Sequence, residues 1–208
     1  MSIRQKLGAA LYDAIMKRPE QAGLQRWRRD LLKQATGTVL EIGVGTGANI
    51  ANYPPEVERL VAVEPNPQMA RRIDVDEFGG AGGVEIVEAY AGDLPVDDAS
   101  VDIVVATLVL CSVPDSAQAL AEIRRVLTDE GRFLFLEHVA AEDDKTRTWQ
   151  DRIDPLWNWC TGDCHMNRRT EAAIRDAGFE FEWIEREPMP KTPSLLRPAI
   201  RGSAVVAS

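Results

Sequence analysis

The sequence predicts an α/β fold with a mostly parallel sheet covered by helices on both faces. Short apolar segments with the character of buried strands alternate with segments of helical periodicity from residue 37 onward. A glycine-rich turn follows the first apolar segment, as in folds that bind a ligand at the ends of their strands. A chain of 208 residues suits one domain that buries roughly 70% of its unfolded surface.

The elements follow in order along the chain. Ile3, Leu7 and Leu11 recur at helical spacing, so residues 2–17 form an amphipathic helix, and a second helix follows Pro19. We expect seven strands, at 38–42, 59–64, 84–88, 101–107, 131–138, 179–186 and 203–207, with helices at 46–52, 67–77, 115–127 and 170–177.

The glycines at positions 43, 45 and 47 are the most informative feature. Glycine permits positive φ and close approach of the backbone to a ligand. Glu41 stands two residues before the first glycine, where its charge suits a cofactor with a cationic amino acid tail and disfavours a pyrophosphate. Glu64 ends the next apolar segment, where an acid can hold both ribose hydroxyls.

Two cofactor classes fit this turn. The spacing Gly43-x-Gly45-x-x-Ala48 also matches the dinucleotide fingerprint, so a hydride-transferring oxidoreductase with NAD is an alternative. The third glycine, Gly47, leaves the loop wide where a dinucleotide site packs its helix tightly, which favours the first class.

Charge is distributed unevenly along the chain. The net charge is −9, but residues 1–36 carry eight Lys or Arg against three acids, which leaves −14 on the remainder. An acidic body repels phosphate backbones, so we expect no nucleic-acid partner. The basic head is either a solvated helix face or a peripheral contact with anionic lipid. Without an apolar run of ~20 residues or a signal-peptide core, and with three cysteines, we expect a cytoplasmic protein.

Two strand ends remain to face a substrate once the cofactor loops are placed. They are residues 107–113 and 137–139. The segment 141–169 then interrupts the alternation with three tryptophans. It is either a lid over an apolar substrate or a helix that packs its tryptophans on the sheet edge.

Four motifs in order resemble the class I S-adenosylmethionine-dependent methyltransferases. They are Glu41-Ile42-Gly43-Val44-Gly45-Thr46-Gly47, Val63-Glu64-Pro65-Asn66, the segment 91–102 with Gly92-Asp93-Leu94, and the segment 120–131. The resemblance implies a Rossmann-like sheet with an antiparallel last strand, and S-adenosyl-L-methionine as the cofactor. It implies a cofactor-binding set of Tyr12, Glu41, Gly43, Gly45, Gly47, Glu64, Pro65, Gly92, Asp93, Leu94 and Thr107.

Within that set we assign roles. Glu41 and the three glycines hold the methionine part, Glu64 holds the ribose, and Pro65 or Asn66 lies beside the adenine. Asp93 accepts from the adenine amino group and the Leu94 amide faces the ring. Tyr12 either folds over the cofactor or packs in the core.

Residues 37–208 further resemble the methyltransferase-like thiol S-methyltransferases, through 107–113, 137–140, 162–164, 169–170 and 197–205. That family begins with a hydrophobic membrane anchor, where this chain has a basic amphipathic head. We therefore expect a helical cap at 1–36, a methyltransferase domain at 37–208, and a lid insertion at 141–169. Related bacterial sequences resemble phospholipid or quinone methyltransferases, which makes a lipid-like acceptor the alternative to a small apolar thiol.

Three residues are candidates for proton transfer. His138, at a strand end, either accepts a proton or makes a structural hydrogen bond, with Asp163 or His165 as substitutes. Cys160-x-x-x-Cys164-His165 resembles a soft-metal cluster but lacks a fourth ligand and a close cysteine pair, so we expect no metal. Cys111 is expected to be a small buried hydrophobe.

Methyl transfer from a sulfonium is a direct displacement, and it demands mainly in-line alignment of the reactants. A thiol, with a pKa near ~8.5, requires little help from a base. A cofactor-binding scaffold without catalysis is a further alternative.

Overall fold

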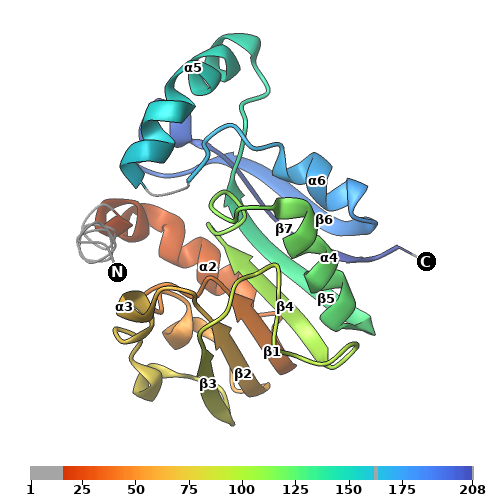
Figure 1. Cartoon of the computed structure of the whole chain (residues 1–208). Coiled ribbons are helices and arrows are strands. Elements are labelled where there is room, and N and C mark those ends of the chain that lie inside the picture. The colour runs from red at the N-terminus through yellow and green to blue at the C-terminus, as the bar shows by residue number, and fades with distance from the viewer. Residues whose placement is uncertain (1–15, 162–163, 208) are drawn as a thin grey trace.

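A computed structural model of the chain describes residues 16–161 and 164–207, except the side chain of Cys160. Within this part, seven strands form one sheet in the order β3-β2-β1-β4-β5-β7-β6 (Figure 1). The first five are parallel, and β7 runs antiparallel to β5 and β6, as predicted. Their bounds are β1 Gly37–Ile42, β2 Val57–Val63, β3 Gly83–Val87, β4 Val101–Thr107, β5 Leu127–His138, β6 Phe179–Pro188 and β7 Pro198–Val206.

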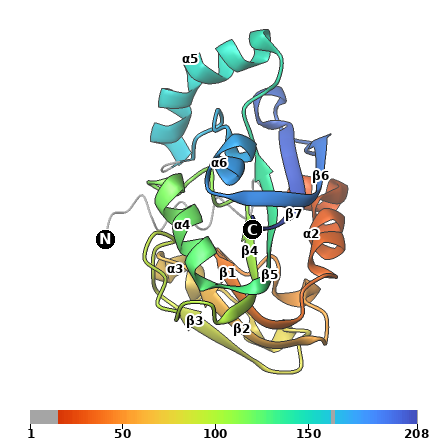
Figure 2. The same cartoon turned by 90° about the vertical axis from the view of Figure 1, so that its right-hand side faces the viewer.

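Helices cover both faces of the sheet. A short π-helical turn, η1 (Glu20–Leu24), leads into α2 (Gln25–Leu32) on one face, while α4 (Ser116–Val126) and α6 (Thr170–Asp176) cover the other (Figure 2). Side chains alternate across β1, because successive residues of a strand point to opposite faces. Val39 therefore packs with the α2 side of the core, and Leu40 and Ile42 pack with the α4 side.

Two predicted helices are shorter than expected. The prediction of a helix at 46–52 was wrong for its first residues, which are turns, and only the 3-10 helix η2 (Ile50–Asn52) forms. The cause is local, because Gly47 has a φ of 91°, which no helix accommodates.

The helix expected at 67–77 divides into α3 (Pro67–Ala70) and the 3-10 helix η3 (Val75–Glu77). Between them Asp74 has an extended backbone, and its side chain accepts from the Asp76 amide to cap η3. An Asp that caps a new turn competes with continuation of the helix before it.

The insertion after β5 contains α5 (Asp144–Thr161), which Figure 1 shows projecting above the rest of the molecule. Gln150, fully buried near the middle of α5, secures it. Its side-chain oxygen accepts from the Ala141 amide at 2.8 Å, and its nitrogen donates to the carbonyls of Met166 at 3.0 Å and Leu195, in η4 (Ser194–Leu196), at 2.8 Å. Gln150 thus joins α5 to both ends of the insertion and to η4.

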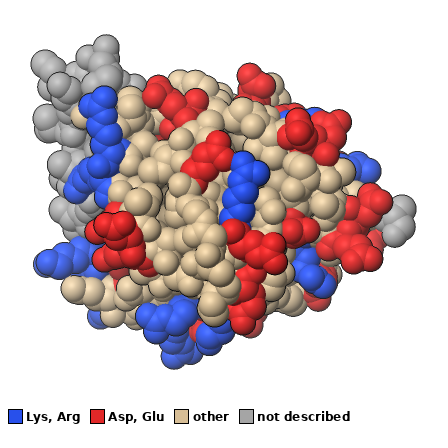
Figure 3. Space-filling model, turned by 90° about the horizontal axis from the view of Figure 1, so that it is seen from below, with Lys and Arg blue, Asp and Glu red and all other residues tan. Residues whose placement is uncertain are grey.

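The described part of the predicted N-terminal cap shares the core of the sheet. Leu24, Leu31 and Leu32 are buried among strand residues, while the helix expected at 2–17 lies almost wholly outside the described residues. Across the part of the chain that the structure describes, we find no helix long and apolar enough to cross a membrane. Acidic and basic side chains are interspersed on the face shown in Figure 3.

Candidate functional site

The glycine turn after β1 has a backbone that only glycine adopts readily. Gly43 and Gly45 both have a φ of 61°, and Gly47 has a φ of 91°. A Cβ added at Gly43 would lie 2.1 Å from Cγ2 of Val109, whereas one at Gly45 would meet its nearest atom, in Met69, at 3.6 Å. Gly43 therefore brings the turn against the loop after β4, and Gly45 leaves a cradle beside the backbone.

Glu64, at the end of β2, orients this turn. Its Oε2 accepts from the Gly45 amide and its Oε1 accepts from the Asn66 amide, both at 2.9 Å. Burial raises the pKa of Glu64, although the two backbone hydrogen bonds favour the carboxylate. A carboxylate offers about four lone-pair sites, so it can still accept from a ligand that carries two hydroxyls.

Glu41 belongs to a buried polar network beneath the turn. It accepts from the Asn49 side chain at 2.9 Å and from the Tyr53 hydroxyl at 2.6 Å. Arg28, which is 2% exposed, donates to Asn49 at 3.1 Å and to the Thr107 hydroxyl at 2.7 Å. Burial raises the pKa of Glu41, against the hydrogen bonds from Tyr53 and Asn49. Glu41 and Thr107, which we expected at the cofactor, use their polar atoms here inside the protein.

The loop expected at the adenine is anchored to α4. Asp93 is exposed and Gly92 is half-buried, as is Pro65 in the loop after β2. The Leu94 amide, which we expected to face the adenine ring, instead donates to Glu122 at 2.9 Å. The hydrogen bond from Arg125 lowers the pKa of Glu122, so the acceptor is a carboxylate.

The loop after β4 bends sharply and is held by one carboxylate. Leu108 has a φ of 57°, a left-handed conformation that costs about 1–2 kcal/mol in a residue with a side chain. Glu137, fully buried in β5, accepts from the amides of Val109 and Leu110, both at 2.9 Å. Strained backbone of this kind collects at functional sites, where the surrounding structure enforces it.

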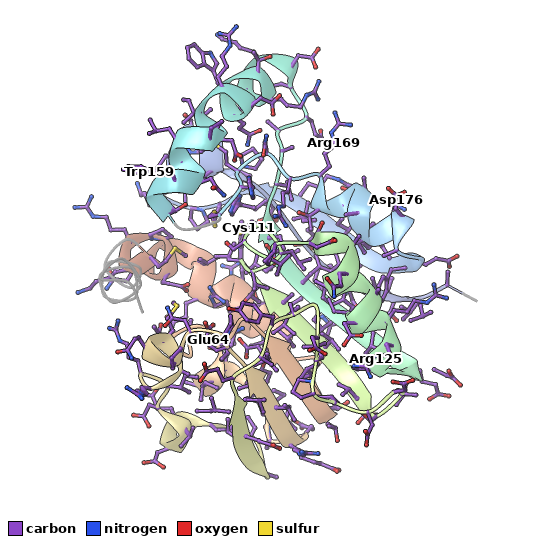
Figure 4. The ribbon with its side chains drawn as sticks, viewed as in Figure 1. Glu64, Cys111, Arg125, Trp159, Arg169 and Asp176 are labelled. Carbon is purple, nitrogen blue, oxygen red and sulfur yellow. The ribbon has the colours of Figure 1, made fainter. Side chains whose placement is uncertain are left out.

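This loop brings two sulfurs and an imidazole together. Cys111 is buried after β4, and His138 ends β5 with 6% of its surface exposed. Nε2 of His138 lies 3.3 Å from Sγ of Cys164, whose thiol points to Sγ of Cys111 at 3.9 Å. The Trp157 indole also donates to Sγ of Cys164, at 3.4 Å. Figure 4 shows Cys111 between α5 and the sheet, at the carboxyl edge that also carries Glu64.

The ionisation of these groups reflects their packing. The hydrogen bond to Cys111 and burial raise the pKa of the Cys164 thiol well above its usual range. For His138, burial acts to lower the pKa, but Cys164 and the charges of Glu137 and Asp154 outweigh it, so the pKa is raised. Packing thus favours the neutral form of the Cys164 thiol and the charged form of the His138 ring.

The other two predicted proton acceptors are placed differently. His165 lies 2.7 Å from Asp154 through Nδ1 and 3.1 Å from the Asn158 side chain through Nε2, so both of its ring nitrogens meet residues of α5. Its role in proton transfer stays a prediction. Asp163 and Tyr12 lie outside the described residues.

Sequence reasoning assigned no role to three residues of the site: Arg28, Glu137 and Gln150. Arg28 was counted with the basic head, although it donates to the buried Asn49 and Thr107 as well as to Glu20 of the head. Glu137 carried a signal, since an acid at the end of a buried strand needs partners. Gln150 carried none that we can identify.

The three tryptophans of the insertion have different surroundings. Trp149 and Trp159 are 48% and 68% exposed, so they do not pack on the sheet edge, while Trp157 points to the cluster. A cavity of about 760 Å³ lies under α5, between Thr146 and Ile200, but none of the predicted site residues lines it. The candidate site is therefore defined by the strand ends.

Comparisons with known proteins identify the family of the chain. A methyltransferase-domain family model matches residues 40–135. The human thiol S-methyltransferase TMT1A is 36% identical over 179 residues, which cover 81% of this chain and 70% of that protein. The rat thiol S-methyltransferase TMT1B is 35% identical over 172 residues, with the same shares.

Solved structures show the same fold at lower identity. An S-adenosylmethionine-dependent methyltransferase of Thermotoga maritima superposes with a TM-score of 0.70 at 20% identity, covering 97% of each chain. One of Mesorhizobium loti gives 0.63 at 17% identity, covering 86% of this chain and 96% of its own. The chain therefore belongs to the S-adenosylmethionine-dependent methyltransferase family and is similar to its thiol S-methyltransferases.

Proposed function

We propose that this methyltransferase methylates the sulfur of a small, apolar thiol. The observation that carries the proposal is the juxtaposition of the donor and acceptor sides. Gly43 of the cofactor turn packs against Val109, two residues before Cys111, and His138 lies beside that loop. Similarity to the thiol S-methyltransferases supports the same acceptor.

The residues of the turn fit S-adenosylmethionine. The open side of Gly45 admits a ligand close to the backbone, and Glu64 has lone pairs left for the ribose hydroxyls. Glu41 places negative charge beneath the turn, which suits the cationic methionine part. When bound, S-adenosylmethionine supplies an electrophilic methyl group on a positively charged sulfur.

The protein's part in the reaction is mainly alignment. Glu137 fixes the loop 109–111, so the acceptor side holds its place relative to the cofactor turn. The acceptor thiol loses its proton to His138 or to water, and its sulfur attacks the methyl carbon in line. The new carbon–sulfur bond forms as the donor's bond breaks, with the electron pair remaining on the donor sulfur.

Incubation with methyl-labelled S-adenosylmethionine and a panel of thiols, amines, quinones and phospholipid vesicles tests the proposal. We expect label in alkyl thiols, with Glu64→Ala inactive and Glu85→Ala, an exposed carboxylate of β3, unchanged as the matched control. Transfer to vesicle lipid or quinone without transfer to thiols would overturn the thiol assignment. If that transfer depends on residues 1–36, the basic head contacts the membrane; binding of the cofactor without transfer to any acceptor would indicate a scaffold.

A further inference from the structure

We propose that Cys111, His138 and Cys164 form a three-ligand site for a soft divalent cation, with zinc as its natural occupant. One ligand atom from each residue lies within 4.8 Å of the other two. From the sequence we considered a different set, Cys160, Cys164 and His165, and expected no metal because that set lacks a fourth ligand and a close cysteine pair. Cys111, His138 and Cys164 are 27 and 26 positions apart in the sequence. The fold brings them together at the carboxyl edge of the sheet.

The distances within the cluster match tetrahedral zinc. With zinc–sulfur bonds near 2.3 Å and zinc–nitrogen bonds near 2.0 Å, a tetrahedron separates two sulfurs by about 3.8 Å and sulfur from nitrogen by about 3.5 Å. The cluster has 3.9 Å between the sulfurs of Cys111 and Cys164, and 3.3 Å between Sγ of Cys164 and Nε2 of His138. Adjustments of a few tenths of an ångström bring these two pairs to the tetrahedral values, and the third pair, Cys111 and His138, lies within 4.8 Å.

The backbone holds the ligands in place without a metal. The His165 amide donates to the Cys111 carbonyl at 2.9 Å, which sets Cys164 beside Cys111. Arg168 donates to the carbonyls of Leu110 and Val113, at 2.7 and 2.6 Å, and so clamps the following segment to the same loop. Such support of the ligands by neighbouring groups is typical of metal sites.

The electrostatics also favour a cation. His138 is 6% exposed, and its Nδ1 has no hydrogen-bond partner among the described residues. The negative charges of Glu137 and Asp154 favour a positive charge at this ring. Zinc with two thiolates and a neutral imidazole has no net charge, so the loaded site suits a buried position. The Trp157 indole, which donates to Cys164, stabilises a thiolate there.

Three protein ligands leave the fourth tetrahedral position open, as in catalytic zinc sites. This part of the inference rests on the proposed function: an acceptor thiol would take that position as a thiolate, releasing its proton to water. The ion would lower the pKa of the acceptor, and because His138 would be a ligand, water rather than His138 would take the proton. After methyl transfer the product is a thioether, a much weaker zinc ligand, and it would leave.

Zinc content and cobalt spectroscopy of the full chain test the site. The protein is expressed with added zinc, purified with a phosphine reductant and without chelator, and analysed by plasma mass spectrometry. We expect about one zinc per chain. Cobalt added to metal-free protein should give tetrahedral visible bands and a sulfur-to-cobalt charge-transfer band. A chain without zinc and with only octahedral cobalt would overturn the proposal.

Variants identify the ligands. Cys164→Ser, at a half-buried position, should weaken cobalt binding more than about a hundredfold, beyond the loss that changes around a metal site usually cause. Cys160→Ser is the matched cysteine control and should keep the metal. If Cys111→Ser fails to fold, the wild-type spectrum and Cys164→Ser still decide. Loss of metal in Cys160→Ser, or unchanged affinity in Cys164→Ser, would overturn the three-ligand set.

A further measurement separates this inference from the proposed function. Addition of an alkanethiol to the cobalt-loaded protein should shift the charge-transfer band, without any cofactor present. A tetrahedral spectrum that no thiol perturbs would remove the open position. Absence of metal together with active thiol methylation would overturn the metal site and leave the proposed function intact.

Discussion

On each side of the site a carboxylate holds a loop in place, but the residues that it joins are separated by different distances in the sequence. On the cofactor side, Glu64 accepts from two amides and holds the turn around Gly45, 19 residues away. On the acceptor side, Glu137 accepts from two amides and holds the loop at Val109, 28 residues away. A buried carboxylate at a strand end thus fixes each loop, and the cofactor loop alone has a compact motif.

The largest expected effect concerns the group that joins the two sides from beneath. Arg28→Met should lower the free energy of unfolding by about 3–5 kcal/mol, because it leaves the buried Asn49, Thr107 and Glu41 without their cation. Urea unfolding measures it. Arg26→Met, on the same helix with an 81% exposed side chain, should change stability by less than about 0.5 kcal/mol. Equal effects would mean that the network does not connect the two sides.

A pair of glycine variants tests the contact between the two sides. Gly43→Ala and Gly45→Ala share the cost of a side chain at a φ of 61°, about 1–2 kcal/mol. Gly43→Ala also collides with Val109, so it should lose about 1–3 kcal/mol more in urea unfolding. Val109→Ala should restore part of that extra loss in the Gly43 variant and none in the Gly45 variant.

The two carboxylates should affect different kinetic quantities. Glu64→Ala should weaken S-adenosylmethionine binding at least about a hundredfold in calorimetry, because hydrogen bonds to a charged group are each worth about 1.5–3 kcal/mol. Glu137→Gln should leave that affinity nearly unchanged and lower kcat about tenfold, through a looser acceptor loop. Unchanged affinity in Glu64→Ala would remove Glu64 from the ribose role. A Glu137 variant that binds cofactor poorly would mean that the two loops are one unit.

The difference between the cofactor side and the acceptor side also explains which features could be predicted from the sequence. Alternation of apolar segments predicted the sheet, and the left-handed glycines with Glu64 predicted the cofactor turn, because these signals are local. Helix ends at 46–52 and 67–77 were misjudged where Gly47 and Asp74 change the backbone. Helical periodicity extends through such positions, while the backbone does not.

The contacts that assemble the acceptor side had no local signal in the sequence. Cys111 and Cys164 are 53 residues apart and meet only because residues 164–168 bond to the loop after β4. In the sequence, Arg28 cannot be told apart from the exposed basic residues near it. Only the fold shows that it lies against Thr107, 79 residues away. Contacts of this kind are set by topology, so neither periodicity nor spacing reports them.

The smallest expected effect compares the pH response of two carboxylates, Glu41 under the cofactor turn and Glu171 in α6. Burial raises the pKa of Glu41 in the folded protein, so its contribution to stability is full below the unfolded pKa of about 4.3 and is lost as the pH rises through the folded value. The hydrogen bond from Arg186 lowers the pKa of Glu171, so its contribution is present above about 4.3 and is lost as the pH falls.

Urea unfolding of the wild type, Glu41→Gln and Glu171→Gln between about pH 3 and pH 8 measures both responses. The wild-type stability minus that of Glu41→Gln should fall as the pH rises above about 4.3, and the difference for Glu171→Gln should rise with pH below it. The two curves therefore have opposite slopes in separate windows, since burial dominates one carboxyl and an exposed ion pair the other. Parallel curves would show that Glu41 is stabilised as a carboxylate, and that the charge of Arg28 outweighs its burial.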